Sequence, residues 1–363
     1  MSMKVLSRTF LGDGSYTTYP HMNAYGDGGR TLIYKRIHDG SARLYLRDLE
    51  SARETMLLDL GTSHRGCWEI AWRGGNRMAV INGKGAWIVD VTRPQEMIEV
   101  YRPPQGASVD ALCSLSGDGQ KLLLREHQNG VNTALEVDLS NGRVTKLFSK
   151  EWFANHFHYC PHDENWVAFA HEGPTEEIPD RCWIWHREHA PEGRLAFDQA
   201  SEQPGVLLCV GHERWCFHDV SAYVIAYAVS PAGRRGLYEI FGDGRPAQLR
   251  WSSDVLWHCT MDRTGRFVAA DTTGPFREEP FSEAAYQLHT DNWRRLDAVK
   301  TPTVVDVIVL DIERQQSLHV AEAWTATHPY HPHPAISPDG RWIAWNDWNS
   351  EHRGIWLAEL ELA

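Results

Sequence analysis

The sequence lacks three features that mark common classes of protein. It contains no run of about 18 apolar residues, the minimum for a membrane-spanning helix. It has no basic excess, because its net charge is −12, whereas broad nucleic-acid binding needs a basic face that displaces counterions from phosphate. Its cysteines have no spacing typical of a disulfide framework or a zinc knuckle. We therefore expect neither a nucleic-acid nor a membrane partner.

The seven cysteines are odd in number, and Cys209 lies inside the apolar run 206–210. Such positions are typical of buried free thiols in a reducing compartment. Residues 1–8 lack the apolar core and the small-residue cleavage site of a signal peptide. The chain is therefore predicted to be a soluble, cytoplasmic protein.

What the sequence does contain is a group of histidines near its end. Residues 325–334 read T-A-T-H-P-Y-H-P-H-P and include His328, His331 and His333. The three prolines exclude a helix, and on an extended strand His331 and His333 project from one face. Three neutral imidazoles supply most of the coordination shell of a divalent transition metal. The segment therefore predicts a metal site, and the alternative is a surface loop of histidines next to prolines.

A tight turn between two apolar strands recurs through the chain. In residues 335–345 the turn Asp339-Gly340 separates two strand-like runs, which is a hairpin signal. Equivalent turns start at positions 27, 74, 118, 163, 219, 264 and 339, at intervals of 47, 44, 45, 56, 45 and 75 residues. A period of about 45 residues is typical of propeller blades. We predict an all-β fold, a single seven-bladed β-propeller domain over residues 1–363 with four-stranded blades around a central channel.

The two long intervals locate insertions, and the chain ends suggest how the ring closes. Insertions are predicted on the rim near 188–204 and 274–300, where function often collects. The early strand 4–10 is expected to pair with the last blade, whose final strand is 354–362. This pairing would hide an otherwise exposed strand edge.

The repeat also predicts which histidines converge. The first strand of each propeller blade lines the channel, so residues at equal distances before their turns should ring one opening. His21, His258 and His333 each lie six residues before a turn, and His331 lies eight before, with the same parity as His333.

Two further histidines, His156 and His212, lie seven residues before their turns. For His212 this odd position predicts either a local bulge or a side chain that faces a neighbouring blade. His21, His156 and His158 are expected to solvate the channel and not to bind metal.

Four segments of the chain resemble the oligogalacturonate lyase family, whose members are seven-bladed propellers. The matching motifs are H-E-G-P at 171–174 with R-C-W-I at 181–184, G-H-E at 211–213, W-H-C-T at 257–260, and H-P-H-P at 331–334 followed by S-P-D-G. They occur in the family's order and cover the fourth to seventh blades. The N-terminal half matches only through Tyr19-Pro20-His21 and the Asp-Gly turn.

The resemblance implies a metal centre, because in that family three histidines and a glutamine bind manganese. By motif, the three histidine ligands here are His258, His331 and His333, and His328 stands at the glutamine's position. An imidazole in place of an amide oxygen makes the donor set softer and richer in nitrogen. Mn is therefore expected from the resemblance, and Zn, Fe, Co or Ni are possible because of His328.

The resemblance also implies a catalytic base, His212, and an assisting arginine, Arg181. The unperturbed imidazole pKa of about 6.5 suits a base near neutral pH. Arg181 can make a bidentate contact to a substrate carboxylate. The alternative for Arg181 is a surface ion pair with Asp180, Glu176 or Glu177.

The function implied by the resemblance is metal-dependent β-elimination. The expected substrates are short uronate oligosaccharides, such as oligogalacturonate or unsaturated digalacturonate, in pectin degradation. Two alternatives stay open from sequence alone. One is a non-catalytic TolB-like propeller that binds a peptide or protein at the channel mouth. The other is a metal-dependent sugar isomerase or hydrolase that uses the same site.

Overall fold

A computed structural model describes residues 3–62, 66–73, 76–200, 207–227, 230–231, 234–277, 287, 303–325, 330–349 and 351–362. The elements whose bounds are described are β-strands and one 3-10 turn, η1 (Asp27–Gly29). Within these ranges no helix is long and apolar enough to cross a membrane.

Residue contacts divide the chain into two compact units. Unit 1 consists of Met1–Tyr16, Gly173–Cys182 and Leu195–Ala363, and unit 2 consists of Thr17–Glu172 and Trp183–Arg194. That the two units form one domain stays a prediction.

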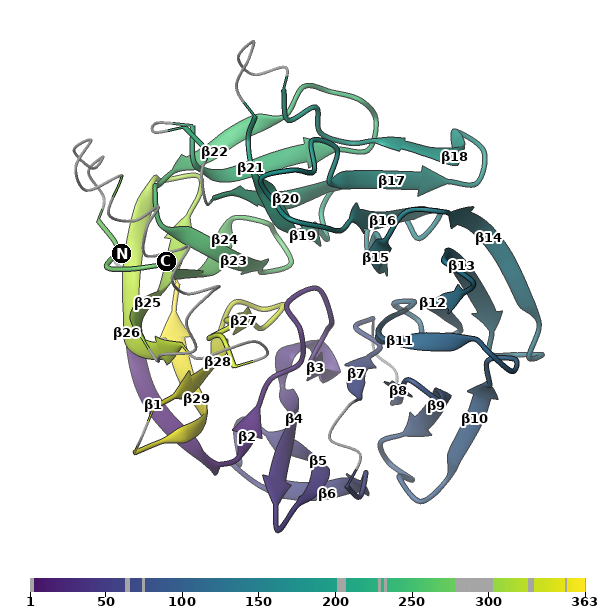
Figure 1. The fold of residues 1–363 in the computed structure, drawn as a ribbon. Coiled ribbons are helices and arrows are strands. Elements are labelled where there is room, and N and C mark those ends of the chain that lie inside the picture. Colours follow the sequence, from purple (N-terminus) through teal and green to yellow (C-terminus); the bar gives the residue numbers. More distant parts are fainter. Residues whose placement is uncertain are drawn as a thin grey trace. The chain divides into compact units, whose positions relative to one another are not determined.

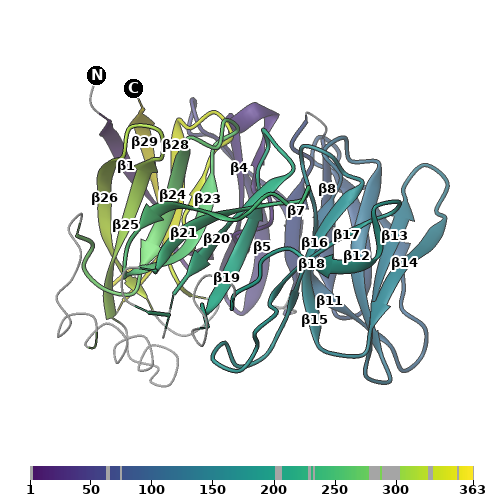
Figure 2. The ribbon, with the colours of Figure 1, turned by 90° about the horizontal axis from the view of Figure 1, so that it is seen from above.

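Unit 1 contains three four-stranded antiparallel sheets and the two-residue strand β2 (Ser15–Tyr16). In two of the sheets the strands follow one another in chain order, as Figure 2 shows for β23 to β26. The first has the strands β19 (Val210–Trp215), β20 (Ser221–Ala226), β21 (Gly236–Phe241) and β22 (Gln248–Ser252). The second has β23 (Leu256–Met261), β24 (Phe267–Thr272), β25 (Thr303–Asp311) and β26 (Gln316–Thr325). The third has β27 (Ala335–Ile336), β28 (Trp342–Trp348), β29 (Arg353–Glu361) and β1 (Lys4–Asp13).

Unit 2 supplies the strands of the other four sheets. One contains β3 (Tyr25–Gly26), β4 (Thr31–His38), β5 (Ser41–Asp48) and β6 (Glu54–Asp59). The next contains β7 (Cys67–Ile70), β8 (Arg77–Asn82), β9 (Gly85–Asp90) and β10 (Met97–Tyr101). The third contains β11 (Ser108–Leu115), β12 (Lys121–Gln128), β13 (Val131–Asp138) and β14 (Val144–Lys150). The last contains β15 (Ala154–Tyr159), β16 (Trp166–His171), β17 (Cys182–His186) and β18 (Ala190–Leu195).

The predicted fold class is confirmed. The chain is all-β and forms the seven blades of a β-propeller, of which six have four strands and one has five. Figure 1 labels these strands along the chain.

The turn that predicted the repeat recurs with the same hydrogen bonds in both units. In unit 2 the amide of Gly119 donates to the carbonyl of Ser116 over 2.8 Å, and in unit 1 the amide of Gly340 donates to the carbonyl of Ser337 over 2.8 Å. Both glycines have positive φ, 68° and 73°, a conformation that glycine adopts without a steric penalty. The local sequence therefore supplies the turn conformation of both hairpins.

The strand expected to close the last blade does so. In the third sheet of unit 1, β1 pairs antiparallel with β29, with Lys4 opposite Glu361 and Thr9 opposite Leu357 (Figure 1). The backbone edge of β29 is thereby covered by a strand of the same chain.

The cores of unit 1 form where the faces of neighbouring sheets meet. One cluster joins Ile225 and Leu237 of the first sheet to Leu256, Val268 and Ile308 of the second, and all five side chains are fully or almost fully buried. Burial of such a side chain contributes about 1.5–3 kcal/mol. Packing of this kind holds the ends of β19 and β23 in fixed positions.

The two predicted rim insertions and the predicted free thiols can be compared with the structure. The rim insertion predicted near 188–204 was wrong for part of its length, because Ala190–Leu195 form β18, the fourth strand of their blade. Residues 201–206, and nearly all of the second predicted insertion at 274–300, lie outside the described residues. The prediction of free thiols is confirmed for six described cysteines, of which five are buried and Cys67 is half-buried.

Candidate functional site

The proposed base lies on a bulge of β19. His212 has φ 59°, and the pairing register with β20 shifts between Gly211 and Arg214. Its ring also reaches the neighbouring sheet, because Nδ1 lies 2.6 Å from the carbonyl oxygen of Trp257 in β23. His212 therefore lies at a local bulge and also faces a neighbouring sheet, which were the two alternatives predicted from its position in the repeat. A bulge commonly re-aims a side chain beside an active site.

His258 is buried on β23, and the carboxylate of Asp271 on β24 holds it. Both carboxylate oxygens lie 2.9 Å from Nδ1 of His258, and one accepts the backbone amide of His258 over 2.7 Å. The other accepts the amide of His333 over 3.2 Å. When Nδ1 carries the proton of a neutral imidazole, Nε2 is left as the donor atom for a metal.

His331 and His333 lie just before β27 and are both buried. Nδ1 of His331 lies 3.1 Å from Oγ1 of Thr325, and its carbonyl accepts from the side-chain amide of Asn346 over 2.9 Å. His333 has φ 44°, so the backbone is not extended there, contrary to the expectation of a straight strand. The two rings nevertheless approach each other, with centroids 5.5 Å apart.

The rings of His258, His331 and His333 form a compact triangle. Their centroids are separated by 4.4 Å for His258 and His333, 5.6 Å for His258 and His331, and 5.5 Å for His331 and His333. Imidazoles that share one metal at bond lengths of about 2.1 Å have centroids roughly 4.5–5.5 Å apart. The three observed separations lie within or next to this range, and the carboxylate behind His258 matches the usual support of a metal-bound histidine.

Sequence reasoning did not identify Asp271. Its signal was a carboxylate directly after the apolar run 267–270, where an ionised group is costly unless polar partners surround it. Burial raises the pKa of Asp271 to about 7, and the backbone amides of His258 and His333 oppose that rise. A cation bound by the adjacent imidazoles would also favour its charged form.

His212 is held neutral by its surroundings. Desolvation by burial lowers its pKa well below the usual value, and the nearby His258 and Arg181 add to this effect. Its ring stacks on Tyr227 with centroids 5.1 Å apart, and the centroid of His258 lies 4.1 Å away. With Nδ1 donating to a carbonyl, Nε2 of neutral His212 can accept a proton.

Arg181 is buried and does not lie on the surface. Nη1 donates to the carbonyl of Gly173 over 3.1 Å, and the backbone amide donates to the side-chain oxygen of Gln199 over 2.7 Å. Gln199 in turn donates to the carbonyl of Leu208 over 2.7 Å. This buried glutamine, which sequence reasoning also missed, fixes the backbone at Arg181.

The structure thus brings together four of the six predicted site residues as a contiguous group of rings: His212, His258, His331 and His333. Arg181 lies near enough to His212 to influence its charge. His328, the fourth predicted ligand, lies outside the described residues.

Comparison with curated proteins supports the motif resemblance. The chain is 33% identical over 205 residues to the oligogalacturonate lyase of Dickeya dadantii, a match that covers 48% of this chain and 52% of that protein. It is 20% identical over 367 residues to the oligogalacturonide lyase of Pectobacterium atrosepticum, over 95% of this chain and 90% of that protein. The resemblance to the oligogalacturonate lyase family is confirmed. The first match spans about half the length of the Dickeya relative.

Solved structures of oligogalacturonate lyases share the fold along almost the whole chain. One, in complex with manganese, has a TM-score of 0.76 and 18% identity over 99% of this chain and 98% of its own. A second, from Vibrio parahaemolyticus, has a TM-score of 0.75 and 15% identity with the same coverage. No protein-family model matches the sequence.

The N-terminal part of the resemblance to the oligogalacturonate lyases falls in unit 2. There His21 stacks on His158 with centroids 5.0 Å apart and an interplanar angle of 20°. Tyr19 and His156 lie against the same ring, with centroids 5.1 Å and 5.3 Å from that of His21. Nδ1 of His158 lies 2.7 Å from the carbonyl oxygen of His156. These contacts form an aromatic cluster within the unit.

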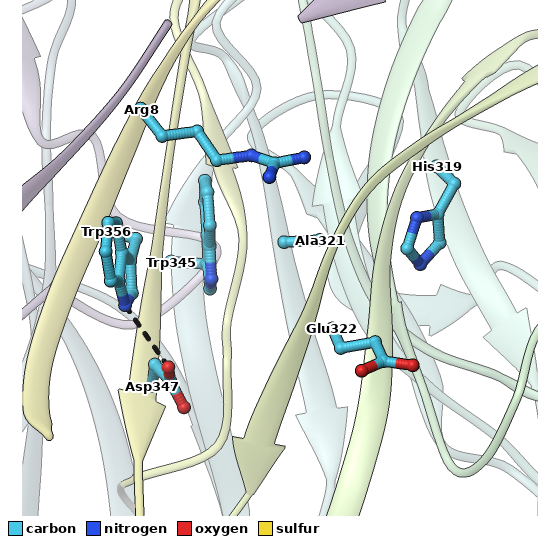
Figure 3. Close-up of a pocket in the computed structure, with 7 residues that line it drawn as sticks. All are labelled: Arg8, His319, Ala321, Glu322, Trp345, Asp347 and Trp356. Carbon is cyan, nitrogen blue, oxygen red and sulfur yellow. Dashed lines mark hydrogen bonds between the residues drawn. The ribbon is translucent and has the colours of Figure 1, made fainter. Parts of the chain in front are cut away.

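Unit 1 also has a pocket with a volume of about 480 Å³ between its second and third sheets (Figure 3). Arg8 extends from β1 and donates to the carbonyl of Val320, and Trp356 donates to Asp347 over 3.2 Å. None of the residues implied by the likeness to oligogalacturonate lyases lines this pocket.

Proposed function

We propose that this chain is a metal-dependent lyase that cleaves short uronate oligosaccharides by β-elimination. The observation that supports the proposal best is that three buried imidazoles, one of them held by Asp271, lie next to the neutral imidazole of His212. The named relatives act on oligogalacturonate or oligogalacturonide, which supports this class of substrate.

In this proposal His258, His331 and His333 hold a divalent cation, with His328 as a fourth ligand. Mn²⁺ is the favoured ion because a related lyase was solved with manganese, and Zn, Fe, Co or Ni remain alternatives for a nitrogen-rich donor set. When bound, the cation supplies positive charge that neutralises the substrate carboxylate as negative charge develops next to it.

His212 is the base in the proposed reaction. Its Nε2 accepts the proton from the carbon next to the substrate carboxylate, while the hydrogen bond from Nδ1 to Trp257 fixes the tautomer. The electron pair of the broken C–H bond forms a carbon–carbon double bond, and the bond from the β-carbon to the glycosidic oxygen breaks. The oxygen leaves with the electron pair of that bond and takes up a proton from water. Its low pKa keeps His212 unprotonated before the substrate binds.

Arg181 is proposed to contact a second carboxylate of the substrate. Its charge lies close to His212, and its backbone is fixed by the buried side chain of Gln199. A planar guanidinium can bind a carboxylate through two parallel hydrogen bonds, which a lysine cannot reproduce. The free thiols of the described cysteines support a cytoplasmic location.

The test is incubation of the Mn²⁺-loaded protein with trigalacturonate and with unsaturated digalacturonate, followed by mass spectrometry of the products. Elimination yields products whose masses sum to that of the substrate. Hydrolysis adds one water, and isomerisation leaves a single molecule of unchanged mass. The assay is repeated with Zn, Fe, Co and Ni in place of Mn. A gain of water, or no product with any of these five metals, would overturn the lyase proposal.

A further inference from the structure

A second group of metal-binding side chains lies in unit 1, outside the histidine cluster. Among the described residues, Cys216, His218 and Glu239 each offer one donor atom, and these atoms lie within 4.8 Å of one another. Cys216 and Glu239 are buried, whereas His218 reaches the surface. The group therefore has two buried donors and a third donor that is accessible to solvent.

The carboxylate of Glu239 on β21 presents its two oxygens to different neighbours. Oε1 accepts the hydroxyl of Ser221 over 2.7 Å and lies 3.7 Å from Nε2 of His218. Oε2 lies 3.5 Å from Nε of Arg250. Arg250 thus engages the oxygen away from His218, and Oε1 lies on the side of the imidazole.

The neighbouring sheet fixes the ring of His218. A Cβ atom at Gly265 would lie 2.1 Å from Cε1 and 2.4 Å from Nδ1 of this ring, so the imidazole packs directly on the glycine backbone. Gly265 has φ 73° in the turn between β23 and β24, and its carbonyl accepts the hydroxyl of Tyr223 over 2.8 Å. The turn therefore holds Nδ1 inward and leaves Nε2 directed towards Glu239.

We infer that Cys216, His218 and Glu239 form a second, zinc-type cation site. One sulfur, one nitrogen and one oxygen donor with an open fourth position suit Zn²⁺, which prefers four ligands and accepts all three donor types. A thiolate donor selects against Mn²⁺, which favours oxygen ligands. The second site therefore differs in metal preference from the site of the proposed lyase reaction.

The experiment is a Co²⁺ titration of the full-length protein, with Co²⁺ as a spectroscopic substitute for Zn²⁺. Ligation by a thiolate produces a sulfur-to-cobalt charge-transfer absorption, which histidine ligands alone do not produce. We expect this absorption to saturate at one equivalent of bound metal and to disappear on addition of Zn²⁺. It should be lost in Cys216→Ala and kept in Cys209→Ala, a matched buried cysteine at the other end of β19.

Two further variants keep the inference falsifiable and separate it from the proposed function. His218→Ala changes a side chain at the surface, so it should fold even if Cys216→Ala does not, and it should also lose the absorption. The double variant His331→Ala, His333→Ala should keep it. Absence of the absorption in the wild type, or its persistence in Cys216→Ala, overturns the second site whatever the outcome of the lyase assay.

Discussion

Both units contain a histidine at a bulge of a first strand. In unit 1 this is His212 on β19, with φ 59°, and in unit 2 it is His156 on β15, with φ 57°. A residue other than glycine in this conformation costs about 1–3 kcal/mol. The propeller repeat has therefore placed the same strained local construction in both units.

The two clusters differ in how their rings face each other. In unit 1, His258 and His333 meet edge to face, at an interplanar angle of 88° and a centroid distance of 4.4 Å. In unit 2, His21 and His158 stack at 20°. Nitrogens of perpendicular rings can point at one position, whereas nitrogens of stacked rings lie in parallel planes.

A carboxylate accounts for part of this difference. Asp271 receives the ring of His258 and the backbone amide of His333, so one buried side chain positions two proposed ligands. In unit 2 the carboxylate of Glu172 lies 3.7 Å from Nδ1 of His156. The comparison teaches that the two clusters differ in which rings their carboxylates hold, and not only in the number of histidines.

The largest effect is expected from removing two proposed ligands of unit 1, and the control removes two histidines of the aromatic cluster in unit 2. His331→Ala with His333→Ala should reduce bound Mn²⁺ from one equivalent to none and abolish turnover, because two proposed ligands are gone. His156→Ala with His158→Ala should keep both. Elemental analysis after dialysis measures the metal, and metal loss in the unit 2 variant would break the comparison.

His212→Ala should lower kcat by about 10²–10⁴-fold, the usual contribution of a general base. The metal content should stay at one equivalent, because His212 is proposed as the base and not as a ligand. Initial rates and elemental analysis on the same preparation separate the two roles. If the variant loses both its bound metal and its activity, His212 is a metal ligand and not only the base.

Asp271→Asn should weaken Mn²⁺ binding by about 10–100-fold, the usual effect of losing the carboxylate behind a metal-bound histidine. The matched control is Asp306→Asn, which alters another carboxylate of the same sheet, 2.8 Å from Nε2 of His319. Competition with a fluorescent chelator gives both affinities. Equal affinities in the two variants would show that Asp271 does not support the site.

The smallest effect on the reaction is expected from substitution of Lys35, a buried and positively charged residue of unit 2. Burial lowers the pKa of Lys35 to about 8 from 10.5, although its ammonium lies 5.0 Å from the ring centroid of Trp68 and donates to the carbonyl of Gly66. Between pH 8 and 10.5 the folded state binds fewer protons than the unfolded state, so stability rises with pH across this window.

Below pH 8 the full cost of burying the charge is present. Lys35→Met should therefore raise the free energy of unfolding at pH 7 by about 1–3 kcal/mol, with a smaller gain at pH 10. Urea unfolding at both pH values measures this, with turnover and metal content unchanged. A gain that is the same at pH 7 and pH 10 would contradict the low pKa.

Local chemistry made much of the fold predictable. Turns such as Ser337 to Gly340 need only neighbouring residues, and they predicted the seven-blade count. The closure by β1 was predicted from the strand-like runs near the two ends of the sequence. β18 was missed because its sequence, A-P-E-G-R-L, has neither the apolar alternation nor the branched residues typical of strands.

In the candidate site, only the residues proposed to contact the metal or the substrate could be predicted from the sequence, and the residue that supports them could not. The motifs gave His212, His258, His331 and His333, which the structure brings together. Asp271 could not be assigned to His258 from the sequence, because their contact depends on the bulged pairing of β23 with β24. Such support is a property of strand register and not of residue spacing.

The pairing of β1 with β29 has a consequence for synthesis. Residues of β1 leave the ribosome about 340–360 residues before their partners between Arg353 and Glu361. At about 5–20 residues per second, the wait is roughly 20–70 seconds. Throughout that time a complete strand has no native partner and is open to pairing with other nascent chains. A circular permutant that encodes β1 directly after β29 would remove the delay and should raise the yield of folded protein.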